Sequence, residues 1–114
     1  MRAVLIDVVK QDVYEIQLEE GLQNIYNAIG NNCDNIEAPI TFESKVHFGN
    51  AMYCDGEIDF RLNDQKGGFA LKDWAYPIMN NALIVGTDED GGDIDHDVDI
   101  EDLKSQIIWY KLRR

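Results

Sequence analysis

The chemically most unusual residues lie in an acidic segment, residues 88–102, in which Asp and Glu predominate and Lys and Arg are missing. Clustered carboxylates are the ligands that Ca²⁺ prefers. A calcium-binding EF-hand loop needs Gly at its sixth position and Glu at its twelfth. A loop starting at Asp93 has Val98 and Lys104 there, and one starting at Asp88 has Asp93 at the sixth position. Because both registers fail, we predict no metal site.

The same segment alternates acids with mostly apolar side chains from Asp93 to Glu101. In an extended chain these carboxylates would form a row spaced by about 6.5–7 Å, which is close to the scale of DNA phosphates. Such a row would attract a basic nucleic-acid-binding protein. The alternative is a solvated loop that keeps the protein soluble and caps the last helix. The candidate partner-binding residues are Asp88, Glu89, Asp90, Asp93, Asp95, Asp97 and Asp99.

Trp74 and Tyr76, close in sequence to Phe69 and Pro77, are candidates for a ligand site or an interface. Exposed aromatic side chains anchor partners or stack on bases. The alternative is a loop that packs onto the sheet. A small ligand such as a nucleotide would need basic groups, which an oligomer could assemble from Arg61, Lys66 and Lys72.

The sequence offers no set of catalytic residues. Cys54 precedes Asp55, and nearby acids raise the pKa of a thiol, which disfavours a nucleophile. We expect Cys33 and Cys54 to be separate, reduced thiols. His96 is expected to be solvated among carboxylates, and His47 to be a packed or surface side chain. Because serine-hydrolase, phosphate-loop and zinc-protease motifs are missing, we expect a non-enzymatic protein without a cofactor.

Size and charge limit the partners further. The chain has 114 residues, with 22 acids against 10 bases and a formal net charge of −12. This length suits one domain, residues 1–114. The charge disfavours direct nucleic-acid binding and anionic membranes, because both need Lys and Arg. Without a signal peptide or an apolar run long enough to span a bilayer, we expect a cytoplasmic protein whose partner is a basic protein.

Strand patterns dominate the chain. Residues 2–9 form a β-branched run, residues 13–18 alternate, and the two together predict a hairpin. Residues 82–86 read as a buried strand closed by glycine. Asp-Gly at positions 55–56 predicts a second hairpin, whose returning strand over 57–62 would place Ile58, Phe60 and Leu62 on one face. Pro39 indicates an edge position or a break in the extended stretch 36–42.

Two helices complete the prediction. Apolar spacing predicts one at about 19–29, with Glu19 and Glu20 in its first turn, and one at about 99–112, with Asp99 as its N-cap. We therefore expect an α+β fold with a largely antiparallel sheet and both helices packed on one side. In such a helix, Trp109 and Tyr110 cannot both face the protein core, and the one that is exposed would allow a homodimer contact.

The order of these elements resembles a family of small proteins of unknown function carried by bacteriophages, prophages and plasmids. The similarity includes the opening at residues 1–6 and the Pro77–Thr87 segment, which precedes an acidic stretch and a last helix. Asn80 stands where the family pattern has glycine, and Asn tolerates the left-handed backbone that such a turn requires. The resemblance implies a phage or mobile-element setting, in which small acidic proteins often block host enzymes. It implies no catalytic residues.

Overall fold

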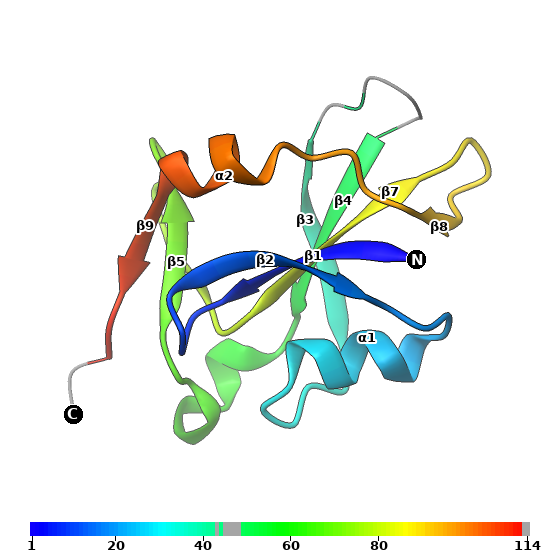
Figure 1. Ribbon diagram of the computed structural model, residues 1–114. Helices are drawn as coiled ribbons and strands as arrows, with labels where there is room; N and C mark the ends of the chain where they lie inside the picture. Colours follow the sequence, from blue (N-terminus) through cyan, green and yellow to red (C-terminus); the bar gives the residue numbers. More distant parts are fainter. Residues whose placement is uncertain (43, 45–48, 113–114) are drawn as a thin grey trace.

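The computed structural model describes residues 1–42, 44 and 49–112, which form one α+β unit (Figure 1). An antiparallel sheet has the order β2-β1-β7-β4-β3, with β8 paired to β7, and a smaller sheet has the order β6-β5-β9. The strands are β1 (Arg2–Asp7), β2 (Asp12–Gln17), β3 (Ile36–Phe42), β4 (Gly49–Asp55), β5 (Gly68–Leu71), β6 (Ile78–Met79), β7 (Ala82–Thr87), β8 (Asp93–Ile94) and β9 (Ile107–Tyr110). The helices are α1 (Leu22–Ile29) and α2 (Ile100–Gln106), with the 3₁₀ turns η1 (Ile58–Phe60) and η2 (Leu62–Asp64).

The large sheet is buried on both faces. On β1, Val4 and Ile6 pack in a cluster that includes Leu103 of α2. Their neighbours Ala3 and Leu5 pack in a second cluster with α1. Successive side chains of a strand point to opposite faces, so the two helices cover opposite faces of the sheet (Figure 1). The α+β class and the antiparallel sheet are confirmed, whereas the placement of both helices on one side is wrong.

The N-terminal half follows the prediction closely. β1 and β2 form the expected hairpin, with Leu5 opposite Tyr14. The helix is shorter than expected, because Gly21 has a φ of 122° and α1 begins at Leu22. Glu19 and Glu20 therefore precede the helix and lie outside its first turn.

The second helix is also shorter than predicted. Asp99 is the N-cap as expected, and its Oδ1 accepts a hydrogen bond of 3.1 Å from the amide of Asp102. The helix ends at Gln106, and the predicted helical residues 107–110 form β9 instead, paired antiparallel with β5. This Ile-Ile-Trp-Tyr run contains the residue types that favour a pleated, half-buried strand, and the pairing supplies partners for the backbone of β5.

The hairpin predicted at residues 55–56 does not form. After β4 the chain enters η1 and η2, which leave Ile58 buried but Phe60 and Leu62 exposed. The cause is the buried carboxylate of Asp55, which accepts hydrogen bonds from the Glu57 amide and from the guanidinium of Arg61. A buried charge needs such partners, so the chain folds back locally rather than extending into a strand.

Candidate functional site

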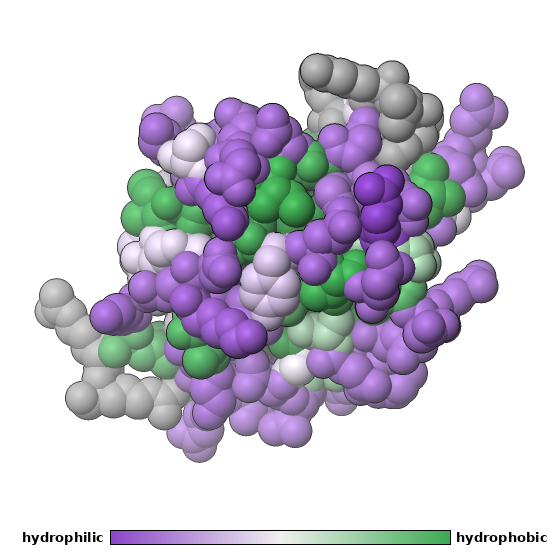
Figure 2. All heavy atoms as spheres, in the orientation of Figure 1, coloured by the Kyte–Doolittle hydropathy of each residue, from purple (hydrophilic) through white to green (hydrophobic). Residues whose placement is uncertain are grey.

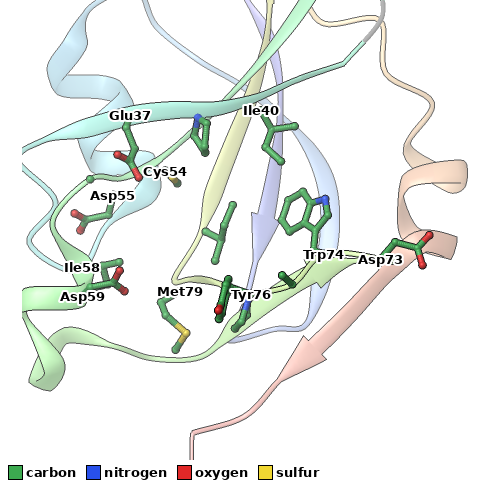
Figure 3. A pocket seen from close by; sticks show the side chains of 15 residues that line it. Glu37, Ile40, Cys54, Asp55, Ile58, Asp59, Asp73, Trp74, Tyr76 and Met79 are labelled. Carbon is green, nitrogen blue, oxygen red and sulfur yellow. The ribbon is translucent and has the colours of Figure 1, made fainter.

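A pocket of about 500 Å³ lies between the edge strand β3 and the segment that leads from β5 to β6 (Figure 3). We call it the Trp74 pocket. Its size is typical of sites for small molecules. Its lining includes the side chains of Glu37, Ile40, Cys54, Asp59, Trp74 and Tyr76.

A β-bulge in β3 shapes one wall of this pocket. Glu37 is opposite Cys54 and Ile40 is opposite Met52, so β3 has one extra residue between these pairs. Residues three apart in a regular strand point to opposite faces, but the extra residue lets Glu37 and Ile40 line the same pocket. Pro39, which lacks an N–H, lies inside the bulge. Its predicted edge position is confirmed, because β3 ends the sheet.

The two predicted aromatic residues lie together in the pocket but differ in exposure. Trp74 is half-buried and packs on Phe69, with ring centroids 6.0 Å apart and planes at 46°. Tyr76 is 82% exposed. The loop therefore packs onto the core through Trp74, as one interpretation of the sequence expected, while Tyr76 remains open to a ligand or partner.

The other end of the pocket is acidic. Figure 3 shows the carboxyl groups of Glu37, Asp55 and Asp59 at one end, away from Trp74. Asp55 is paired with Arg61. In the described part of the chain no hydrogen-bond donor or cation contacts the Glu37 or Asp59 carboxylate, so these two charges remain uncompensated.

Cys54 forms part of the pocket lining beside these acids. It is 3% exposed, and among the described residues its thiol has no hydrogen-bond partner. Burial raises its pKa to about 12, and the charges of Glu37 and Asp55 add to the effect. The thiol therefore stays protonated at neutral pH and is a poor nucleophile, as the sequence predicted. Cys33 and Cys54 are both free, again as expected.

Asn80 anchors the turn next to the pocket. Its φ is 68°, which is the left-handed conformation expected where the family pattern has glycine. Its fully buried side chain accepts a hydrogen bond of 2.7 Å from the Lys66 amide and donates one of 2.9 Å to the Asp64 carbonyl. Asn80 thereby ties the loop after η2 to the β6–β7 turn.

The middle of the acidic segment, residues 93–98, lies against the large sheet, whereas Glu89, Asp90 and Asp99 are exposed. Tyr53 donates to Asp93 at 2.8 Å, and Arg2 donates to Asp95 through its amide and its Nε. Burial of Tyr53 and its bond to Asp93 raise the pKa of this phenol to about 12. Asp97 accepts hydrogen bonds from side chains of two other segments, Ser44 and Asn50.

His96 corrects one expectation, because it is buried rather than solvated. Its Nδ1 accepts from the Val98 amide, and its Nε2 lies 2.7 Å from Oε1 of Glu15 on β2. The backbone amide of His96 also donates to the carbonyl of Arg2. His47, the other histidine considered from the sequence, lies outside the described residues.

Two candidate carboxylates of the segment are held in place by backbone amides. Asp88 accepts hydrogen bonds from the backbone amides of Asp90 and Gly92, and Asp99 accepts one from an amide of α2. Glu89 and Asp90 are exposed at the tip between β7 and β8, where hydrophilic side chains cover the surface (Figure 2). Val98 packs against the core between Asp97, which is bound to Ser44 and Asn50, and the exposed Asp99.

Within the described residues, no group of three or more His, Cys, Asp or Glu is placed to hold a metal ion. No described helix is both long and apolar enough to cross a membrane. No family model, curated protein or solved structure matches the chain.

The sequence pointed to both regions but missed half of the pocket. Glu37, Ile40 and Asp59 were not among the candidates, because they come from separate segments whose meeting depends on the sheet order. The one local signal was Pro39, whose presence in an extended stretch is typical of an edge strand or a bulge.

Proposed function

We propose that the chain is a non-enzymatic binding protein, encoded by a phage or another mobile element, that inhibits or modulates a basic host protein. The target would be a nucleic-acid-processing or defence protein whose Lys and Arg side chains bind the carboxylates of the acidic segment in place of phosphates. The genomic setting rests on the family resemblance, and the cytoplasm of the host follows from it as the expected location.

One observation carries the proposal: neutral donors hold several carboxylates without cancelling their charge. Asp88 and Asp99 are held by backbone amides, and Asp93 by the hydroxyl of Tyr53. A charge fixed in this way loses little conformational freedom when a cation binds, so more of the electrostatic attraction is retained as affinity. Asp95 contributes less, because Arg2 already pairs with it.

The test is a pull-down from bacterial lysate at low and at moderate salt, followed by competition with duplex DNA. The variant Asp88→Asn/Asp93→Asn removes two charges while keeping an oxygen that accepts the existing hydrogen bonds. The matched control, Asp34→Asn/Glu57→Gln, removes two exposed charges from loops at the other end of the sheet (Figure 1).

We expect the wild type and the control to retain a basic protein that salt weakens and duplex DNA displaces. Each exposed charge pair contributes roughly 0.2–1 kcal/mol, so the Asp88/Asp93 variant should bind roughly 2- to 30-fold more weakly. Equal retention by both variants, or retention that DNA does not affect, would contradict nucleic-acid mimicry.

Two alternatives have less support. A nucleotide-sequestering site would need cations near Trp74, but Arg61 is already bound to Asp55 and Asp64 and the Trp74 pocket is acidic. A divalent-cation module would show a thermal shift with calcium and none with sodium at equal ionic strength.

A further inference from the structure

The Trp74 pocket combines three features that act on a ligand together. It has an aromatic part formed by Trp74 and Tyr76, with Asp73 beyond Trp74, an apolar wall that includes Ile40, and an acidic end with Glu37 and Asp59. It contains no residue of the acidic segment, so it is separate from the surface proposed above to bind a partner.

The charge of the pocket determines whether a cationic or an anionic ligand can bind. Glu37 and Asp59 have no compensating cation among the described residues, and Arg61, the nearby base, is occupied by Asp55 and Asp64. An anionic ligand would meet uncompensated like charges. A cation would neutralise them, and it would also be attracted by the electron-rich faces of aromatic rings.

The pocket also contains a buried polar group without a partner. Cys54 is 3% exposed, its side chain belongs to the pocket lining, and within the described part of the chain its sulfur is not hydrogen-bonded. A neutral thiol is a weak acceptor, which suits the N–H groups of a cation. The sulfur is therefore a third acceptor beside Glu37 and Asp59.

We propose that the Trp74 pocket binds a small organic cation, an alkylguanidinium or alkylammonium whose charged head lies toward Glu37 and Asp59 and whose apolar stem packs along Ile40 and the aromatic rings. The volume of about 500 Å³ accommodates such a molecule. The bulge around Pro39 has a functional role in this arrangement, because it directs an acidic and an apolar side chain of one strand into one site.

The test is an NMR titration of the intact chain with n-butylguanidinium, following the backbone amides of Gly56 and Ala75 in the pocket. The matched neutral probe is n-butylurea, which has nearly the same shape without the charge, and the anionic probe is pentanoate. We expect saturable shifts with the guanidinium, binding at least about 5-fold weaker with the urea, and none with pentanoate. No saturable binding of n-butylguanidinium, or equal binding of the urea, would overturn the proposal.

Variants then assign the two ends of the pocket. Tyr76→Ala and Glu37→Gln, both at exposed positions that the fold does not need, should each weaken guanidinium binding roughly 2- to 5-fold. The matched controls Phe60→Ala and Glu20→Gln remove an exposed ring and an exposed acid outside the pocket and should leave binding unchanged. If the controls weakened binding equally, the effect would not depend on the pocket, which would contradict a defined site.

A last comparison distinguishes a free small-molecule cation from an arginine side chain of a protein. A blocked arginine amide has the same head and a stem that continues into a peptide backbone. Weaker binding than n-butylguanidinium assigns the pocket to free small molecules, and equal binding assigns it to guanidinium groups that include protein side chains. Both results support cation recognition, and neither depends on whether the acidic segment binds a basic protein.

Discussion

Replacing Asn80 tests whether one side chain fixes both the β6–β7 turn and the loop after η2. Its backbone has a φ of 68°, and its fully buried side chain bridges the Lys66 amide and the Asp64 carbonyl. Asn80→Gly keeps the left-handed backbone and removes both side-chain hydrogen bonds. Asn80→Ala removes the same bonds but, unlike glycine, has a Cβ, and alanine adopts the left-handed backbone less readily than asparagine or glycine.

The two variants therefore separate two free-energy contributions. Each of the two part-buried backbone groups that loses its hydrogen-bond partner costs about 1–2 kcal/mol, less than the roughly 3 kcal/mol of a fully buried group. We expect Asn80→Gly to lower the free energy of unfolding by about 2–4 kcal/mol. Asn80→Ala should lose about 1 kcal/mol more, because a left-handed backbone is costly for a residue with a Cβ.

Urea unfolding followed by circular dichroism measures these differences. With a slope of about 2 kcal/mol per molar urea, the midpoint for Asn80→Gly should fall by about 1–2 M, and that for Asn80→Ala by roughly a further 0.5 M. Asn63→Ala, at an exposed position in η2, is the control and should shift stability by less than about 0.5 kcal/mol. A glycine variant as stable as the wild type would refute the role of the side chain, and equal midpoints for glycine and alanine would refute the role of the backbone.

Three further results are expected. Tyr53 should ionise near pH 12, so the tyrosinate absorbance that the wild type has and Tyr53→Phe lacks should appear only well above pH 10. The stability that the neutral phenol contributes should be lost as pH rises from 10 to 12. Titration of Tyr53 near pH 10 would contradict this. The Arg2 amide and guanidinium lower the pKa of Asp95, so Asp95→Asn should destabilise the protein at pH 7. The difference from wild type should shrink as pH falls below the ordinary pKa of Asp, and a difference that does not change with pH would exclude this cause. Leu103→Ala should lower the free energy of unfolding by about 2–5 kcal/mol, because it leaves a cavity in the core. Ile108→Ala, at a side chain that is 46% exposed, should lower it far less, and similar losses would show that Ile108 packs in the core.

The sequence predicts an element well where its signal is local. The alternation in residues 13–18 and the β-branched run before it predict the first hairpin, because the positions of the apolar residues show which side chains of each strand are buried. Asp99 is recognisable as an N-cap because capping needs only an acceptor and the next amides. The left-handed turn at Asn80 was expected only from the resemblance, whose pattern has glycine there, and Asn is one of the few other residues that adopt this backbone readily.

Predictions from local patterns were wrong where distant segments determine the structure. Ile107 and its neighbours continue a helical spacing of apolar residues, but their backbone pairs antiparallel with β5 and they form the strand β9. At Asp55 and Gly56 the cause is closer in the sequence: Arg61, six residues after Asp55, pairs with the buried carboxylate, and the predicted hairpin turn does not form. His96 is buried because Glu15 and the Arg2 carbonyl, far away in the sequence, give it partners. The Trp74 pocket needs the sheet order for the same reason, since its walls come from strands that only tertiary folding brings together.

The attachment of the acidic segment to β1 also has a consequence for folding. β1 pairs with β7 near the other end of the chain, and the Arg2 amide then donates to Asp95, 93 residues later. Closing loops of this length is entropically costly and slow, so contacts of this kind lower the folding rate. On the ribosome, β1 and β2 form a hairpin without their central partner until residues 82–87 have left the exit tunnel. The large sheet therefore assembles only after residues 82–87 have emerged, and until then the apolar strand β1 has one unpaired edge, which favours aggregation.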